Sequence, residues 1–381
     1  MVDHEPAVER QLPDQAGPGR AMDLLDPARI GGAMGVGVSI RRAWPAAGGS
    51  LTFEARETAT GRIRAGAITA DGGIRGSAFG EDPALTGLSS AVGTGELLVH
   101  RFGKRAVLKQ PGTGTNPVFV KILRAGKVGR VAHAHQYAQT LASGCSLGVP
   151  RVLAEDRTSL TLSAVPGTSL FSLGSGVLRS ANVVDGAIPE ADPSWADAWI
   201  RFTELWPRFA RSASDSLPLH TALDEYRTVH QWVAHAQTHG TLDVDPLLIK
   251  DSLEQLRLKL CAVPAQDPVL AHRDLHDKQV FFDAERNTMG LIDCDTLALA
   301  EPALDLANLL VHLDLRQAQG LLGAATAATA AAQLRETASL LGVSTQRLDA
   351  YAAATRLRLA CVYSFRPSYR ALARRWALQA D

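Results

Sequence analysis

The chain has 381 residues, of which 46% are hydrophobic and 20% charged, a composition typical of a globular protein with a sizeable core. Its 39 basic side chains balance its 39 acidic ones, so no overall charge favours nucleic acid or a membrane as a partner. The four cysteines form no CxxC pair, and the N-terminus lacks the apolar segment of a signal peptide. We therefore expect a cytoplasmic protein without a disulfide framework or a structural zinc site.

The first half of the chain is predicted to be rich in β-strands. Residues 1 to about 35 mix Pro, Gly and charged residues, as a loosely held tail does. In residues 50–73, apolar and polar residues alternate on both sides of ETATG, which predicts a hairpin. Three strand-like runs follow, ELLVHRF, AVLKQ and VFVKIL, and then a helical segment at 128–143 and two short strands, VPRVLAED and SLTLSAVPG.

Beyond Pro166 the apolar residues recur at helical spacing. Three such segments, at 194–213, 221–239 and 247–263, precede a strand pair, VFFD and MGLIDCD, after which helices continue to the C-terminus. The Ala-rich segment LLGAATAATAAAQL is too short and too weakly apolar to span a bilayer. The pattern predicts an α+β fold with three parts: an N-terminal tail and β-rich cap (1–88), a small β-rich lobe (89–166) and a helical lobe (167–381).

The motif HRDLHDKQVFFD, residues 272–283, carries the groups that phosphoryl transfer requires. That reaction needs a carboxylate to receive the proton of the acceptor hydroxyl and oxygen ligands for magnesium. Asp274 is the candidate for the base, and the amide of Gln279 follows five residues later as a candidate metal ligand. A predicted hairpin then returns Asp293 to the same place as a second ligand.

These residues resemble the aminoglycoside phosphotransferase and choline kinase branch of the protein-kinase-like fold. That family has a His-x-Asp loop ending in Asn, an Ile-Asp element and a downstream Asp, and the matching residues here are His272, Asp274, Gln279, Asp293 and Asp305. The resemblance implies a bilobal kinase that uses ATP and Mg²⁺, with Asp274 as base, Gln279 and Asp293 as metal ligands and Asp305 as a brace of the loop. With Gln279 where most of the family has Asn, the loop resembles that of bacterial maltokinase-like and glucosamine-kinase-like sugar kinases, which also have Gln at this position.

A kinase-like small lobe also needs a lysine on a central strand to hold the nucleotide phosphates. Lys121 is favoured over Lys109 because a predicted helix follows it directly, as in the fold that the motif resembles. The usual acidic partner of that lysine is missing, since the segment 126–143 contains no Glu or Asp. The polar residues of that helix within reach of the lysine are His135, Gln136 and Gln139.

Two further parts of the nucleotide site are weaker in the sequence. The turn HRFGKR, which would cover the phosphates, has a single glycine. The segment LSAVPG, 162–167, is the candidate hinge, and we expect the backbone of Ser163 and Val165 to bind the adenine edge. Asp295 is either a further metal ligand or only the cap of the turn after Asp293.

The acceptor is predicted to be a small molecule with a hydroxyl group, most simply a sugar or amino sugar. Six arginines and one carboxylate side chain lie between residues 355 and 381. If part of this segment faces the acceptor, it argues against a polycationic antibiotic; otherwise it is a solvated helix face. Asp224 and Glu225 are possible acceptor ligands, whereas the tryptophans of 194–213 have the spacing of core residues.

Two rivals to a sugar kinase remain: an aminoglycoside-type antibiotic phosphotransferase, and a catalytically silent module that binds a nucleotide or a sugar. The sequence leaves open the identity of the acceptor, the choice between ATP and GTP, and the oligomeric state. The hairpin of residues 50–73 resembles, in position and length, the N-terminal cap of maltokinase-like proteins.

Overall fold

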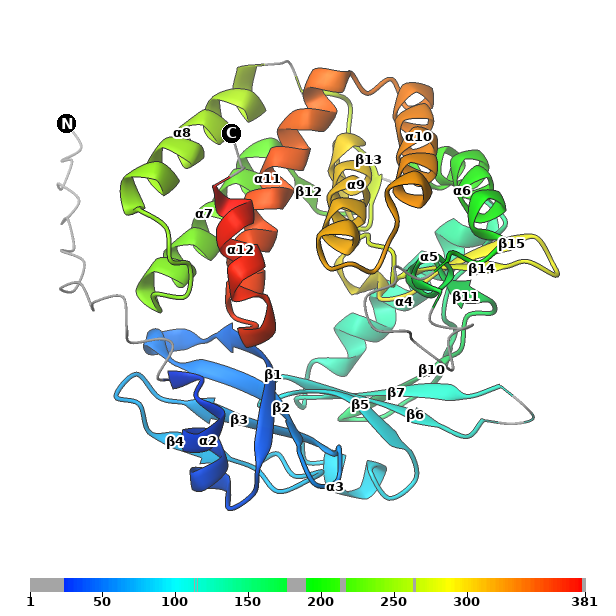
Figure 1. Cartoon of the computed structure of the whole chain (residues 1–381). Helices are drawn as coiled ribbons and strands as arrows, with labels where there is room; N and C mark the ends of the chain where they lie inside the picture. The colour runs from blue at the N-terminus through cyan, green and yellow to red at the C-terminus, as the bar shows by residue number, and fades with distance from the viewer. Residues whose placement is uncertain are drawn as a thin grey trace, which may run out of the picture.

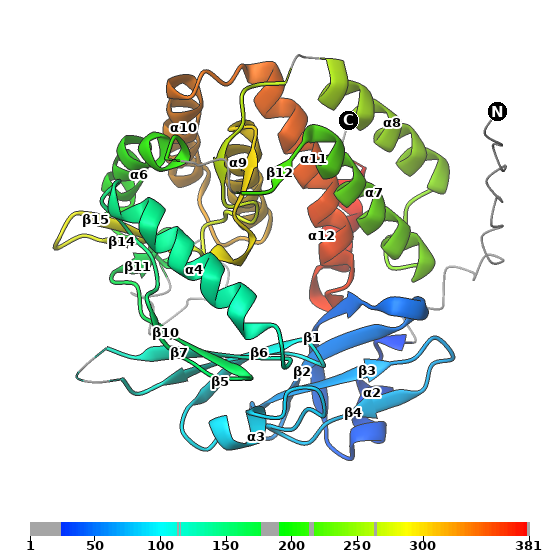
Figure 2. The ribbon, with the colours of Figure 1, turned by 180° about the vertical axis from the view of Figure 1, so that it is seen from behind.

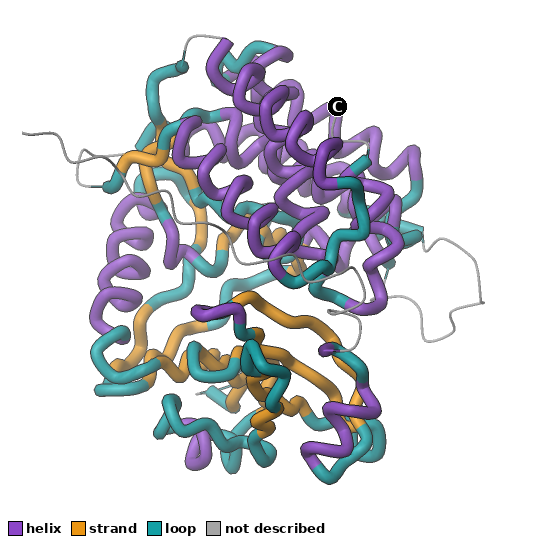
Figure 3. The backbone as a smooth tube through the Cα atoms, turned by 90° about the vertical axis from the view of Figure 1, so that its left-hand side faces the viewer, coloured by secondary structure: helices purple, strands orange, loops and turns teal. Residues whose placement is uncertain are grey.

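The computed structural model describes residues 24–112, 114, 116–176, 190–212, 217–262 and 265–378. Strands dominate its N-terminal part and helices its C-terminal part (Figures 1 and 3). The predicted α+β architecture with a small β-rich lobe and a larger helical lobe is confirmed. No helix in the described part of the chain is both long and apolar enough to cross a bilayer.

The N-terminal cap is an antiparallel sheet with the strand order β1-β2-β3-β4. Its elements are α2 (Pro27–Met34), β1 (Val38–Pro45), the short turn η1 (Ala47–Gly49), β2 (Leu51–Glu57), β3 (Ile63–Ile68) and β4 (Ile74–Gly76). The predicted hairpin corresponds to β2 and β3. Strand β1 is not predicted by the sequence because a bulge between Ile40 and Arg42 shifts its alternation, so that Ala43 follows Ile40 as the next buried residue. The predicted tail also extends too far, because Asp26 caps α2.

The small lobe is a five-stranded sheet with the order β5-β6-β7-β10-β9. The elements around it are α3 (Leu88–Ala91), β5 (Glu96–Arg101), β6 (Arg105–Gln110), β7 (Val118–Leu123), α4 (Val128–Ser143), β9 (Val152–Glu155) and β10 (Ser159–Ser163). All five strands and α4 agree with the predicted segments. Ile63 of the cap and Leu85 and Leu88 of the connection pack with Leu108 and Val120 of this sheet, so the cap and the small lobe share one core.

The C-terminal lobe is built from helices around two small sheets. The helices are α5 (Leu170–Ser175), α6 (Trp195–Ala210), α7 (Ala222–Thr238), α8 (Pro246–Ala262), α9 (Ala303–Ala318), α10 (Ala324–Leu340), α11 (Thr345–Ser364) and α12 (Arg370–Ala377), with short turns η2 (Cys294–Thr296) and η3 (Pro367–Tyr369). One sheet has the order β11-β14-β15-β8, from Thr168–Ser169, Val280–Asp283, Thr288–Leu291 and Leu147–Gly148. The other has the order β12-β16-β13, from Leu219–His220, Ala298–Ala300 and Val269–Ala271.

Two features bring the lobes together at the candidate site. Gly167, between the lobes, has a φ of 93°, and a Cβ there would lie 2.4 Å from the carbonyl of Phe282, so only glycine lets the chain pass this close to β14. Helix α4 runs from the small lobe toward the helical lobe (Figure 2) and contacts η2, which follows the hairpin β14–β15. The end of that hairpin is thereby held against both lobes.

Candidate functional site

A buried carboxylate on α9 fixes the loop that follows β13. The backbone N–H groups of His272 and Arg273 donate to the two oxygens of Asp305, at 2.6 and 2.9 Å. Arg273 has a φ of 69°, a left-handed conformation that costs a non-glycine residue roughly 1–2 kcal/mol and persists only where surrounding contacts hold it. Burial raises the pKa of Asp305, although His272 and the two donors oppose the rise. These contacts hold the turn that presents Asp274.

Asp274 is exposed, and the buried Gln279 lies beside it. The main chain of Gln279 is fixed at both ends, because its N–H donates to His276 at 2.9 Å and its carbonyl accepts from Ile292 at 3.0 Å. Its side-chain Nε2 lies 3.4 Å from Oδ2 of Asp274. Its Oε1 is buried and has no hydrogen-bond partner among the described residues. A buried oxygen without a partner is costly, so this atom is available for a ligand.

Lys121 of β7 lies at the centre of an ionic cluster that joins the two lobes. Its Nζ lies 2.9 Å from Oδ1 of Asp293 and 2.7 Å from Oδ1 of Asp295, both at the end of the hairpin β14–β15. His135 of α4 is fully buried, and its Nε2 lies 2.9 Å from Oδ1 of Asp295 and 3.3 Å from Nζ of Lys121. The position that an acidic residue of α4 would fill is thus taken by a histidine that acts together with Asp295.

Opposite charges determine the protonation states in this cluster. Burial alone would lower the pKa of Lys121, but Asp293 and Asp295 outweigh it and raise the pKa. Burial would likewise raise the pKa of both carboxyls, but Lys121 holds the pKa of Asp293 down, and the hydrogen bond from His135 together with Lys121 holds down that of Asp295. Asp293 adopts a φ of 62°, a strained conformation for a non-glycine residue of the kind found at functional sites.

The oxygens of this site suit a magnesium ion that shares its coordination with a nucleotide. Within the described ranges, no group of three or more His, Cys, Asp and Glu side chains is arranged to hold a metal ion by itself. Mg²⁺ commonly takes one or two carboxylates and completes its shell with water and substrate phosphates. Asp293 and the partnerless Oε1 of Gln279 provide a donor set of that kind.

The structure places the other candidates of the small lobe away from this cluster. Lys109 is exposed on β6, where it lies opposite Glu96 of β5. Gln139 donates to the carbonyl of Pro150 at 3.3 Å. Lys121 and His135 are therefore the residues that β7 and α4 bring to the candidate site.

The glycine turn between β5 and β6 is anchored to the connection that follows the cap. The N–H of Gly103, which has a φ of 62°, donates to Oδ2 of Asp82 at 2.6 Å, and the same oxygen lies 3.0 Å from Nε2 of His100. Asp82 was not singled out in the sequence, where it lies in a Gly- and Pro-rich segment without a recognisable motif. Arg105, after the turn, contributes to lowering the pKa of Asp293, which puts a further cation on the nucleotide side.

The hinge candidates differ in how their groups are used. The N–H of Ser163 donates to the carbonyl of Arg151, and the Ser163 hydroxyl accepts from the Arg151 N–H, both at 2.9 Å. Val165 is half-buried and packs so closely on Gly290 of β15 that a Cβ there would lie 2.1 Å from the valine. The backbone of Ser163 is thus engaged in pairing β10 with β9, and Val165 is the hinge residue that packs on the C-terminal lobe.

Several predicted acceptor-side residues have structural partners. Asp224 completes the capping box of α7 with Thr221, and this hydrogen bonding lowers the pKa of Asp224 to about 2. Glu225 is buried, with its Oε2 at 3.0 Å from Nε2 of His220 and its Oε1 at 3.6 Å from Nε of Arg358. The buried tryptophans of α6 belong to the core, as their spacing predicts, and are Trp195, Trp199 and Trp206.

The arginine-rich C-terminal segment divides into two groups. Arg356 pairs with Asp314 at 2.7 Å and Arg374 with Asp243 at 3.2 Å, on the surface of the helical lobe. Arg366, in contrast, lies in the turn between α11 and α12, next to the cap strand β1. Of the six arginines, Arg374 and Arg375 are exposed, and the other four are half-buried, so only part of this segment is the solvated helix face that its composition suggests.

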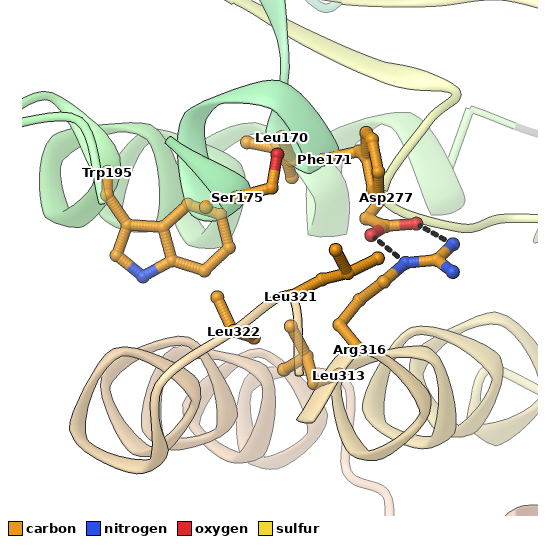
Figure 4. Close-up of a pocket in the computed structure, with 10 residues that line it drawn as sticks. Leu170, Phe171, Ser175, Trp195, Asp277, Leu313, Arg316, Leu321 and Leu322 are labelled. Atoms are coloured by element: carbon orange, nitrogen blue, oxygen red, sulfur yellow. Dashed lines mark hydrogen bonds and ion pairs between the residues drawn. The ribbon is translucent and has the colours of Figure 1, made fainter. Parts of the chain in front are cut away.

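A small hollow lies behind the loop of residues 272–279, between α5, α6 and α9 (Figure 4). Leucine side chains and Trp195 line most of it, and the ion pair between Asp277 and Arg316, with N–O distances of 2.7 and 2.9 Å, closes one side. It is too narrow to hold a water molecule. The Asp277–Arg316 ion pair borders it, and none of Lys121, Asp274, Gln279 and Asp293 lines it.

Comparisons with known proteins show the family of the chain. The model of a family described as "Phosphotransferase enzyme family" matches residues 100–341. One similar solved structure is an aminoglycoside phosphotransferase from Streptomyces rimosus, with 19% identity, coverage of 73% of this chain and 96% of that chain, and a TM-score of 0.49. A second is a macrolide 2′-phosphotransferase from Brachybacterium faecium, with 15% identity, coverage of 76% of this chain and 91% of that chain, and a TM-score of 0.47. A third is a choline/ethanolamine kinase family protein from Mesorhizobium loti, with 14% identity, coverage of 78% of this chain and 89% of that chain, and a TM-score of 0.45. A search of curated proteins gave no match.

Proposed function

Because this chain belongs to the phosphotransferase enzyme family, we propose that it transfers the γ-phosphoryl group of ATP to a hydroxyl of a small molecule, with a sugar as the acceptor class. The observation that carries the proposal is the convergence of Lys121, Asp293, Gln279 and Asp274 from two lobes and three separate segments. A cation, an acidic metal ligand, an amide ligand and an exposed carboxylate are the parts that phosphoryl transfer uses.

Each residue has a role that follows from its surroundings. Asp274, exposed at the tip of a braced turn, accepts the proton of the acceptor hydroxyl. At the same time the oxygen of that hydroxyl forms a bond to the γ-phosphorus of ATP, and the bond from the γ-phosphorus to the oxygen that remains on ADP breaks. Asp293 and Gln279 hold Mg²⁺, which when bound neutralises charge on the phosphates. Lys121 moves part of its ionic contact from Asp293 to the phosphates, while Asp295 and His135 keep the ammonium in place. The proposed hinge residues for the adenine edge are Val165 and Ser163, although the N–H of Ser163 already donates to the carbonyl of Arg151.

The predicted parts of the chain are proposed with the same boundaries. Residues 1–88 form a tail and cap, 89–166 the nucleotide lobe and 167–381 the lobe of the catalytic loop and acceptor. The family match begins at residue 100 and so leaves the cap outside it. The cap is then a further segment beside the phosphotransferase unit, and its strand β1 contacts the turn between α11 and α12.

Two rival functions have less support. An antibiotic-type phosphotransferase for polycations would have an acceptor side rich in carboxylates, whereas Lys278 lies in the same loop as Asp274 and its ammonium shares the Phe171 ring with Arg316. A silent binding module would have no use for an exposed carboxylate in a turn that a buried aspartate braces. The missing acid of α4 favoured such a module, but the contact of Lys121 with Asp295 supplies the negative charge.

The proposal is tested by measuring ADP release from magnesium-ATP with a panel of hexoses, amino sugars, maltose, sugar acids and aminoglycosides. Asp274→Asn is expected to lower kcat by at least a hundredfold at unchanged thermal stability, because an amide cannot take the proton. Asp251→Asn, an exposed change on α8, is the matched control. Retention of full turnover by Asp274→Asn with the best acceptor would show that Asp274 is not the base.

A further inference from the structure

The cap touches the C-terminal lobe next to the catalytic loop. The N–H of Ala43 in β1 donates to the carbonyl of Phe365 at 2.9 Å, at the turn between α11 and α12. Figure 1 shows this turn directly beside the edge of the cap sheet. The residues adjacent to the two bonded ones in the chain are Arg42 and Arg366, so the junction brings together arginines from opposite ends of the sequence.

These arginines belong to a cationic cluster, defined here as Arg42, Lys278, Arg316 and Arg366. Lys278 is exposed, and its ammonium and the Arg316 guanidinium lie over the same Phe171 ring. The Arg316 side chain also forms a hydrogen bond with Tyr363, whose ring faces the Arg366 guanidinium. The pKa of Arg366 is lowered by burial and by the charges of Arg42 and Arg316. The four cations therefore act on one another across the cap, the catalytic loop, α9 and the turn after α11.

Aromatic rings hold the members of the cluster in place. The Lys278 ammonium lies 4.1 Å from the centre of the Phe171 ring, and the Arg316 guanidinium lies 4.9 Å from the same ring. The Arg366 guanidinium lies 3.8 Å from the ring of Tyr363. Such contacts stabilise a cation without neutralising its charge. The cluster is thus positioned by the fold and still positively charged.

Carboxylates offset only part of this charge. Asp277 pairs with Arg316. Glu54 is buried and is shared by Arg42 and its neighbour Arg41, each at 3.1 Å, so one negative charge faces two positive ones. Among the residues that the structure describes, neither Lys278 nor Arg366 forms an ion pair with a carboxylate. This part of the molecule therefore carries an excess of positive charge, which favours the binding of an anion.

The cluster adjoins the proposed base and lies apart from the groups for the nucleotide phosphates. Lys278 is in the same loop as Asp274, and the ring of His276 between them is affected by the charge of Asp274 and by that of Arg316. Lys121 and Arg105 act on Asp293 instead. Arg42 and Arg366 also lie outside the residues that the family model matches.

We propose that the cationic cluster binds an anionic group, a carboxylate or a phosphate, on the molecule whose hydroxyl is phosphorylated. This inference rests on the proposed function and narrows it from sugars in general to acidic or already phosphorylated sugar derivatives. It disfavours an amino sugar without an anionic group. The cap then has a part in acceptor selection, because Arg42 is its contribution to the cluster.

The test compares four acceptors of similar size and different charge: glucose, glucosamine, gluconate and glucose 6-phosphate. ADP release by the full-length protein gives kcat and KM for each, and calorimetry gives binding of the same compounds and of inorganic phosphate without nucleotide. We expect gluconate or glucose 6-phosphate to exceed glucose at least tenfold in kcat/KM. Arg366→Gln should raise KM for the anionic acceptor at least tenfold and leave KM for ATP within twofold, and Arg366→Lys should restore part of the loss.

Arg374→Gln, which removes an exposed arginine of α12 far from the loop in sequence, is the matched control and should change neither constant. Preferred turnover of glucose or glucosamine would overturn the inference and leave the kinase intact. If no acceptor is turned over, the proposed function fails for this panel, and binding decides the inference separately. Binding of an anionic compound that is lost in Arg366→Gln supports it, and absence of binding by gluconate, glucose 6-phosphate and phosphate refutes it.

Discussion

Replacement of His135 by leucine removes the hydrogen bond from α4 to Asp295 while keeping a side chain of similar volume. In the native protein, Nε2 of His135 lies 2.9 Å from Oδ1 of Asp295, and Asp295 in turn holds Lys121 at 2.7 Å. Nδ1 of His135 is buried without a partner among the described residues, which fits a ring whose hydrogen is on Nε2. Leucine would leave Asp295 with Lys121 as its remaining charged contact at this atom.

The size of the effect follows from the kind of bond that is lost. A hydrogen bond to a charged group contributes about 1.5–3 kcal/mol, and each 1.4 kcal/mol corresponds to a factor of ten in an equilibrium or a rate. Lys121 would then be free to turn toward Asp293 alone, which competes with the proposed metal ligation. We expect kcat/KM for ATP to fall roughly tenfold to a hundredfold, chiefly through KM.

The assay is ADP release at saturating acceptor with ATP varied, at two magnesium concentrations. His135→Gln is the matched control, because its amide can still donate to Asp295 and should retain most of the activity. A thermal melt of each variant separates a local effect from a loss of folding. If His135→Leu keeps the KM for ATP of the native protein, the histidine does not position Lys121, and the reasoning about α4 is wrong.

Two further predictions concern stability. Arg347→Met should lower the free energy of unfolding, measured in urea, by about 3–5 kcal/mol, because the buried carboxylate of Glu301 loses the Arg347 Nε that lies 2.5 Å from it. Adding Glu301→Gln to this variant should recover part of the lost stability. A decrease below about 1 kcal/mol for Arg347→Met would contradict the argument. Asp224→Asn should cost about 1 kcal/mol through the capping box of α7. Since the folded-state pKa of Asp224 is lowered to about 2, its contribution should be constant above about pH 5 and vanish as the pH falls toward 2, and a difference between the proteins that persists at pH 2 would refute this assignment.

The sequence predicted elements best where hydrophobic periodicity was regular. Helix α4 and the five strands of the small lobe lie where their patterns predict them. Strand β1 was not predicted, because its bulge at Ile40–Arg42 breaks the alternation of buried residues. The two-residue strands of the helical lobe are too short to have a period, and they form only where tertiary contacts supply a partner strand.

For the site, the spacing within one loop was informative and contacts between distant segments were not. The relation of Asp274 to Gln279 follows from five residues of local sequence. The contact of Lys121 with Asp295 joins positions 174 residues apart, so whether Asp295 is a ligand, a cap or a counter-ion could not be decided from spacing. The junction of Arg42 with Arg366 was beyond reach for the same reason, since no sequence pattern connects the cap with the turn after α11.

The bond between Ala43 and Phe365 attaches the cap to the large lobe, in addition to the connection at residues 163–167 and the contacts of α4 and Lys121. In a molecule joined only at residues 163–167, the lobes could swing open about that single point. Here the cap shares its core with the small lobe and is also anchored to the large one, so any rotation must follow an axis that passes through both attachments. An opening motion that departs from this axis would have to break the bond of β1 to the large lobe, so the junction favours movement of the lobes about it.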